Sequence, residues 1–136
     1  MIKSNISAKP LRTMLYVPAN REEWIRKAPK YQADAIILDL EDSVPMNQKE
    51  MARDIVSRVI PELAASGVTV IVRVNDLSTG MTEDDLSCAV SKGIYSISLP
   101  MTTGPQDVME LDRLISVEED RKKMPSRCVL TDPGME

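Results

Sequence analysis

The sequence predicts an α/β fold in which parallel strands alternate with helices. Four short apolar runs are separated by segments that carry apolar residues at helical spacing: Met14–Val17, Ala35–Leu40, Val68–Val74 and Ile97–Leu99. Such nearly unbroken apolar runs are typical of parallel strands buried on both faces. Polar, charged or Pro residues follow each run, and α/β folds place their chemistry where strands end. We therefore expect a (β/α)8 TIM-barrel type of fold with part of an active site at one edge.

The length limits how much of such a barrel the chain supplies. The chain has 136 residues, whereas a complete eight-stranded barrel needs roughly 250. We expect the first four βα units and the start of a fifth strand over 128–130. Residues 1–11 read as a polar lead-in, and 12–136 as the N-terminal half of the barrel domain.

The first two units are predicted in detail. A strand over 13–17 ends at Pro18, and a helix follows from about 21 to 27, with Asn20 and Glu23 in a capping-box pattern. After the second strand, Asn47 and Glu50 repeat that pattern before a longer helix. Pro61 within this helix predicts a kink or a break.

The later units are shorter. Thr82 is expected to cap a helix that runs to Lys92. A strand over 96–99 follows, and Pro105 suits the first turn of the next helix. The charged stretch 118–123 reads as a solvated link.

Composition excludes several classes of function. The net charge of −4 gives no reason to expect nucleic acid, and no apolar run approaches the ~20 residues of a membrane span. The first residues lack the apolar core of a secretion signal, so we expect a cytoplasmic protein. Cys88 and Cys128 read as reduced thiols. With no histidine in the chain, a metal would be a hard ion held by carboxylates, Mg²⁺ or Mn²⁺.

Three acids and one arginine are the candidates for chemistry. Asp39, Glu41 and Asp42 lie at the end of an apolar strand, where they serve either a catalytic rim or loop solvation and helix capping. Arg73 interrupts an apolar strand, and a guanidinium there is costly unless paired. It either pairs with those acids or holds a substrate carboxylate, and the two roles are compatible.

Lysine placement separates two kinds of carbon–carbon lyase. A Schiff-base aldolase needs a desolvated lysine, often on a strand, and none of the four predicted strands contains one. The pattern favours metal-assisted enolate chemistry. Glycine-rich phosphate loops are absent from the sequence.

Four segments resemble a known family. Residues 12–20 (RTMLYVPAN), 33–42 (ADAIILDLED), 72–75 (VRVN) and 98–100 (SLP) occur in the order found in the citrate lyase β-subunit-like branch of the HpcH/HpaI aldolase superfamily. That branch includes citryl-CoA, malyl-CoA and citramalyl-CoA lyases. The sequence departs from it at Met101, where relatives carry lysine, and at Glu23.

The resemblance implies roles for individual residues. Arg73 matches the substrate-binding arginine, while Tyr16 and Lys27 match positions near the substrate and the CoA phosphates. Glu41 and Asp42 match the acidic rim, and Glu136 matches a metal-binding glutamate on strand five, with Asp132 a weaker candidate.

The implied activity is that of a Mg²⁺-dependent lyase. Such an enzyme cleaves a short 3-hydroxyacyl-CoA or thioester into an acyl-CoA and a 2-oxo acid, and is a homo-oligomer, often a trimer, or a citrate lyase subunit. The chain alone is expected to be inactive, because further catalytic residues of the family lie beyond its length. The alternative is a catalytically incomplete subunit that binds an acyl-CoA or a partner.

Overall fold

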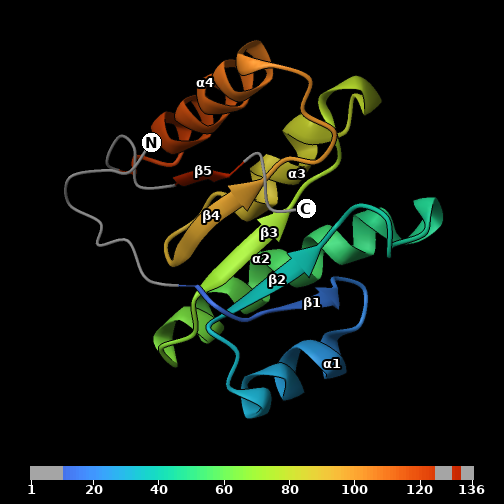
Figure 1. The fold of residues 1–136 in the computed structure, drawn as a ribbon, viewed down its shortest axis with the longest axis vertical. Helices are drawn as coiled ribbons and strands as arrows, with labels where there is room; N and C mark the ends of the chain where they lie inside the picture. The colour runs from blue at the N-terminus through green and yellow to red at the C-terminus, as the bar shows by residue number, and fades with distance from the viewer. Residues whose placement is uncertain (1–10, 125–129, 133–136) are drawn as a thin grey trace.

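A single parallel sheet organises the chain in the computed structural model, which describes residues 11–124 and 130–132. Its strands are β1 (Met14–Pro18), β2 (Ala35–Asp39), β3 (Val70–Arg73), β4 (Ile94–Ser98) and β5 (Leu130–Asp132). They lie side by side in the order β1-β2-β3-β4-β5, all parallel (Figure 1). Sequential order with parallel pairing is the arrangement in a (β/α) barrel wall.

Helices connect successive strands. They are α1 (Glu22–Lys27), α2 (Lys49–Ala65), α3 (Thr82–Ala89) and α4 (Pro105–Arg121), with short 3₁₀ turns η1 (Ala28–Tyr31), η2 (Met46–Gln48) and η3 (Leu77–Thr79). Figure 1 shows α2 and α3 on the far side of the sheet, α1 beside β1, and α4 beside β4 and β5. Within the described residues, no helix is long and apolar enough to cross a membrane.

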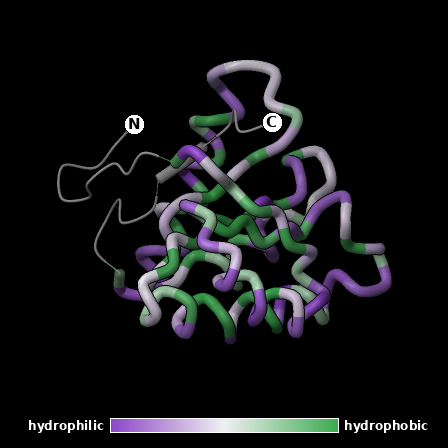
Figure 2. Tube along the Cα trace, turned by 60° about the horizontal axis from the view of Figure 1, so that its bottom comes forward, coloured by the Kyte–Doolittle hydropathy of each residue, from purple (hydrophilic) through white to green (hydrophobic). Residues whose placement is uncertain are grey.

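The core lies between the helices and one face of the sheet. Alternate strand residues such as Leu38 and Val72 share one buried cluster with residues from all four helices, for example Ile25, Ile60 and Leu111. The opposite face carries a smaller cluster of Ala35, Ile37 and Ile71. Figure 2 shows hydrophobic stretches running through the interior of the trace. Helices on one face only distinguish this wall from a doubly wound sheet and confirm the predicted fold class.

The register aligns the carboxyl ends of the strands. Pro18 pairs with Asp39, Asp39 with Arg73, Arg73 with Ser98, and Ser98 with Asp132. Side chains of residues paired in register on neighbouring strands point to the same face. The side chains of Asp39 and Arg73 are therefore neighbours on one face of the sheet. The candidate site is therefore at this edge.

The predicted helix caps are wrong. Arg21 precedes α1 without a side-chain cap, and Asn20 instead donates a hydrogen bond to Gln48. Gln48 precedes α2, also without a side-chain cap. Thr82 is the first residue of α3, and its hydroxyl donates to main-chain carbonyls of the preceding loop. The side chains of Asn20 and Thr82 thus make contacts outside the helices that they were predicted to cap.

Three further expectations are corrected. Of the kink or break predicted at Pro61, the break is wrong, because α2 continues to Ala65 with Ile60 and Leu63 buried on either side of the proline. The stretch 118–123 is no solvated link, because α4 continues to Arg121 and buries Glu118 and Glu119. The helix α3 also ends before Lys92, at Ala89. Cys128 lies outside the described residues, whereas the predicted start of strand five is confirmed as β5.

Candidate functional site

An ion pair between Arg73 and Asp39 forms the centre of the candidate site. Arg73 Nε lies 2.9 Å from Asp39 Oδ1, and Nη2 lies 3.0 Å from Oδ2. The side chains are 14% and 3% exposed. Two parallel charge-assisted hydrogen bonds fix the guanidinium in orientation as well as position. The predicted pairing of Arg73 with a strand-two acid is therefore confirmed, while its contact with a substrate stays a prediction.

Asp39 also organises the turn that follows β2. Its carboxylate accepts hydrogen bonds from the amide of Glu41 (2.9 Å), the amide of Ser43 (3.1 Å) and the hydroxyl of Ser43 (2.6 Å). Burial opposes ionisation, but the hydrogen bonds from Arg73, Ser43 and the Glu41 amide outweigh it and lower the pKa of Asp39. Asp39 is therefore an ionised anchor that joins the turn to Arg73.

Tyr16 approaches the same guanidinium from β1. The Arg73 Cζ atom lies 5.1 Å from the centroid of the Tyr16 ring, within the range of a cation–π contact. Tyr16 is 41% exposed, so its ring is both a support for Arg73 and an accessible surface beside it. The structure thus brings together two residues that the sequence assigned to substrate binding.

The other rim acids lie next to this pair. Glu41 Oε1 is 3.6 Å from Arg73 Nη2, and the side chain is 20% exposed. Burial, followed by the charge of Asp42, raises the pKa of Glu41. Asp42 is exposed. The guanidinium of Arg73 acts in the opposite direction and lowers this pKa, but burial and Asp42 outweigh it, so the Glu41 carboxyl holds a proton more readily than a free glutamate does.

Lys27 occupies a different position from the rim residues. It is exposed at the end of α1 and lines a groove of about 410 Å³ with Tyr16, Trp24 and Tyr31. Tyr16 therefore connects the groove to the Arg73 centre. An exposed ammonium in a groove with aromatic walls is chemically suited to a phosphate-bearing ligand.

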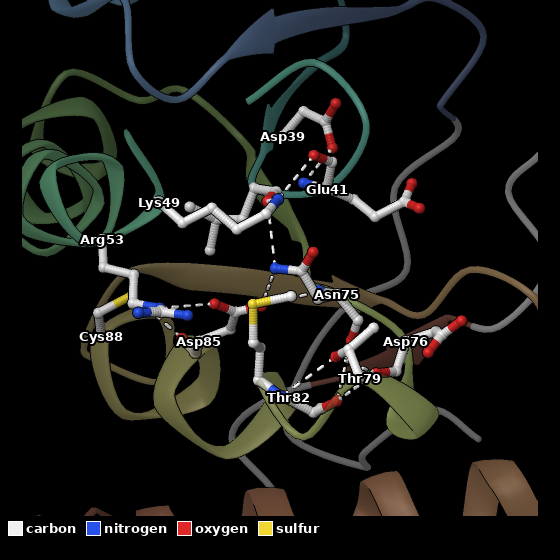
Figure 3. Close-up of polar contacts among 12 residues, drawn as sticks. Asp39, Glu41, Lys49, Arg53, Asn75, Asp76, Thr79, Thr82, Asp85 and Cys88 are labelled. Carbon is white, nitrogen blue, oxygen red and sulfur yellow. Dashed lines mark hydrogen bonds and ion pairs between the residues drawn. The ribbon is translucent and has the colours of Figure 1, made fainter. Parts of the chain in front are cut away.

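A buried polar network that the sequence patterns did not predict lies behind the rim. The Asp85 carboxylate, fully buried on α3, accepts hydrogen bonds from the Asn75 amide (2.8 Å), the Asn75 side chain (2.6 Å) and Arg53 (2.8 Å). Asn75 Nδ2 also donates to the Leu40 carbonyl (3.1 Å), and Lys49 Nζ donates to the same carbonyl (2.7 Å). Figure 3 shows these side chains converging between α2, α3 and the ends of β2 and β3.

A signal for this network was present in the sequence. Lys49 falls on the same helical stripe as the buried Ala52 and Val56 of α2, and Asp85 falls beside the buried Leu86 of α3. A charged residue on an apolar stripe needs a buried partner. The pattern could have indicated two such residues, although not the partners they meet.

The described residues contain only some of the carboxylates of the predicted metal centre. Glu136, the candidate ligand, lies outside the described residues. In the ranges 11–124 and 130–132, no group of three or more Asp, Glu, Cys or His side chains is arranged to hold a metal ion. Asp39 is committed to Arg73, which leaves Glu41 and Asp42 as carboxylates at the rim. The described residues therefore do not make a Mg²⁺ ligand set by themselves.

The chain is similar to citramalyl-CoA lyase and to the beta subunit of citrate lyase. The sequence profile of the HpcH/HpaI aldolase/citrate lyase family matches residues 12–131. Rat (Rattus norvegicus) mitochondrial citramalyl-CoA lyase is 32% identical over 123 residues, which is 89% of this chain and 36% of the relative. Citrate lyase subunit beta of Escherichia coli K12 is 33% identical over 118 residues, 85% of this chain and 39% of the relative.

A solved structure shows the same arrangement. Protein CitE from Mycobacterium tuberculosis, in complex with magnesium, acetoacetate and coenzyme A, superposes with a TM-score of 0.59 at 33% identity. The match covers 72% of this chain and 35% of that protein. The chain thus spans little more than a third of the length of these relatives. The family profile covers nearly all of the sheet and its rim, and on that basis the chain belongs to the HpcH/HpaI aldolase/citrate lyase family.

Proposed function

We propose that this chain is part of a Mg²⁺-dependent carbon–carbon lyase that cleaves a short 3-hydroxyacyl-CoA, or an equivalent thioester, to an acyl-CoA and a 2-oxo acid. The observation that carries the proposal is the guanidinium of Arg73, held by two hydrogen bonds to Asp39 at the carboxyl edge of the sheet. Substrates of the citryl-CoA, malyl-CoA and citramalyl-CoA type all present a carboxylate and a hydroxyl group that such a guanidinium can bind.

The reaction needs charge stabilisation more than a nucleophile. The hydroxyl proton leaves, the carbon–oxygen bond becomes the carbonyl of the oxo acid, and the bond to the neighbouring carbon breaks. Its electron pair forms the enolate of the acyl-CoA, which then takes up a proton. A guanidinium fixed before the reaction stabilises developing negative charge without reorganising.

Each rim residue has a proposed role in this scheme. Arg73 binds the substrate carboxylate and the oxygen that becomes the carbonyl, and Tyr16 contacts the substrate beside it. Glu41 and Asp42 form the acidic rim, where the raised pKa of Glu41 suits proton transfer. Lys27 binds a phosphate of CoA at the groove next to Tyr16.

Two observations support magnesium as part of the proposal: the family resemblance makes Glu136 a candidate ligand, and the similar protein CitE has been solved in complex with magnesium. A bound divalent ion would stabilise negative charge on the substrate oxygens. Since the described residues do not form its ligand set, we assign no step to the ion. The use of Mn²⁺ in its place stays a prediction.

A direct assay tests the proposal. The protein, purified as its gene encodes it, is incubated with citryl-, malyl- and citramalyl-CoA with and without Mg²⁺, and acyl-CoA and 2-oxo acid are measured by chromatography. We expect cleavage of at least one thioester only with the metal. Thioester binding without cleavage would support the alternative, a binding module without catalysis.

Arginine variants locate the activity. Arg73→Ala is expected to abolish cleavage, and Arg73→Lys to reduce it strongly because a lysine cannot make the two parallel bonds to Asp39. Arg113→Lys is the control, because Arg113 forms an exposed ion pair with Glu110 on α4. Normal turnover by folded Arg73→Ala protein would refute the assignment.

Assembly and location complete the proposal. A homo-oligomer, such as a trimer, or an assembly with citrate lyase subunits is the expected state, and light scattering of the purified protein measures it. The cytoplasmic location stays a prediction, since one relative is a mitochondrial enzyme.

A further inference from the structure

Lys49 has an environment that local sequence rules disfavour. It is the first residue of α2 and is 7% exposed. The positive end of the helix dipole repels a cation at this position, and burial removes the ammonium from water. In the part of the chain that the structure describes, Lys49 pairs with main-chain carbonyls and not with a carboxylate.

The compensating contacts all involve the turn at the rim. Lys49 Nζ donates to the carbonyl of Leu40 at 2.7 Å and to the carbonyl of Glu41 at 2.9 Å. Figure 3 shows the lysine reaching from α2 toward the backbone beside Glu41. The amide of Glu41 points the other way, to Asp39 Oδ1. The peptide groups around Glu41 are thus held from both sides, by Lys49 and by Asp39.

The rest of the buried network reinforces the same segment. The Leu40 carbonyl accepts a second hydrogen bond, from Asn75 Nδ2, in addition to the one from Lys49. Asp85 accepts a hydrogen bond from the same side-chain amide of Asn75 and so orients it. Arg53 in turn neutralises Asp85. The network therefore converges on the main chain that carries Glu41, although none of its members faces the open side of the rim.

We propose that Lys49 is a positioning residue of this enzyme, whose buried ammonium fixes the carbonyls of Leu40 and Glu41 and thereby holds the Glu41 side chain opposite Arg73. The inference deepens the proposed lyase function and rests on it for its catalytic consequence. Its structural part, the fixing of the turn, can be measured without any turnover.

Lys122 provides a matched control. Its Nζ also donates to two main-chain carbonyls, those of Ser87 and Val90, and so joins the end of α4 to the end of α3. These contacts lie at the ends of helices that follow β3 and β4, away from the turn after β2. Lys49→Met and Lys122→Met each remove one ammonium and keep a long apolar side chain. Only Lys49→Met removes a hydrogen-bond donor to the carbonyls of Leu40 and Glu41 at the rim.

Amide hydrogen exchange of the protein as its gene encodes it tests the structural part. In Lys49→Met we expect exchange at the amides of Glu41 and Ser43 to accelerate by on the order of tenfold or more, while Val72 in the central strand keeps its protection. Lys122→Met should leave the Glu41 and Ser43 amides unchanged. Unchanged exchange at Glu41 in folded Lys49→Met would overturn the proposal. A loss of protection that extends to Val72 would also do so, because Lys49 would then support the fold as a whole.

Kinetics test the catalytic part. A small displacement of a catalytic group can cost on the order of a hundredfold in rate, so kcat of Lys49→Met should fall tenfold to a hundredfold with KM nearly unchanged. Lys122→Met should retain both values. An equal loss of kcat in the two variants would refute a positioning role. If the wild-type protein cleaves no thioester, the proposed function fails, and the exchange data alone decide the role of Lys49.

Discussion

Replacing Asp39 by asparagine is the most direct test of the charge pair at the rim. The carboxylate accepts two hydrogen bonds from Arg73 and three from the turn after β2. An asparagine of the same shape keeps one oxygen but presents an NH₂ group to one set of donors. The guanidinium, whose side chain is 14% exposed, then lacks a carboxylate partner.

The expected cost follows from that geometry. Breaking a buried ion pair by removing one partner costs about 3–5 kcal/mol. Because Arg73 keeps some contact with solvent and the asparagine keeps one acceptor, we expect Asp39→Asn to lower the free energy of unfolding by about 2–4 kcal/mol at pH 7. Urea titration, followed by the fluorescence of Trp24, the single tryptophan, measures this value.

The pH dependence gives an independent check. The pKa of Asp39 is lowered in the folded state, so its ionised form stabilises the fold. This contribution is fully present above an unfolded pKa of about 3.9 and is lost as the pH falls through the lower folded value. The difference between wild type and Asp39→Asn should therefore shrink as the pH is lowered below about 4.

An exposed ion pair supplies the control for this experiment. Glu110 and Arg113 lie 2.8 Å apart on the surface of α4, and exposed pairs contribute little. Glu110→Gln should leave the unfolding curve nearly unchanged. If Asp39→Asn behaves like Glu110→Gln at pH 7, or if its deficit does not shrink in acid, the account of the Arg73 centre is wrong.

Three further predictions concern a glycine, a thiol and a rim acid. Gly93→Ala should lower the free energy of unfolding, measured by urea titration, by about 2–4 kcal/mol, because φ is +102° and the new Cβ would lie 2.6 Å from a side-chain carbon of α2. Gly67 also has a positive φ, but open space surrounds the position of a Cβ. Gly67→Ala should therefore lower the free energy of unfolding by only about 1 kcal/mol. Burial, and then a nearby carboxylate, raise the pKa of Cys88 to about 12, so iodoacetamide at pH 8 should modify it slowly in folded protein and rapidly in urea, as followed by peptide mass spectrometry. Asp42→Asn should lower the pKa of Glu41, because it removes a neighbouring negative charge, and a carboxyl ¹³C titration in which this pKa stays the same would contradict the assigned cause.

The fold was predictable because it depends on local patterns. The runs at 35–40 and 68–74 are apolar at nearly every position, and their buried residues lie on both faces of the sheet, as is typical of a parallel strand between two neighbours. The position of Arg73 beside the strand-two acids was also predictable, since parallel strands of similar length end at the same edge. The observed register pairs Asp39 with Arg73 directly.

The errors arose where tertiary contacts override local rules. The stretch 118–123 is rich in charge, yet Arg121 pairs with Glu118 one turn away and Lys122 reaches the carbonyls at the end of α3. These contacts let a charged segment continue as helix. Asn20 forms no cap, and its side-chain amide donates instead to Gln48, 28 residues later. Such partners cannot be read from spacing in one sequence.

Two layers of residues, one on each side of the sheet, surround the segment that follows β2. Arg73 and Asp39 lie on the open face of the sheet, whereas Asp85 and Lys49 lie among the helices on the other side. Residues of both layers form hydrogen bonds with the short segment after β2. Asp39 accepts hydrogen bonds from its amides, and Lys49 donates hydrogen bonds to its carbonyls. A turn held by one layer alone could rotate about its peptide groups and move Glu41 away from the guanidinium. With its amides bonded to Asp39 and its carbonyls to Lys49, the turn is held from opposite sides, which is the preorganisation that charge stabilisation would need in the proposed lyase.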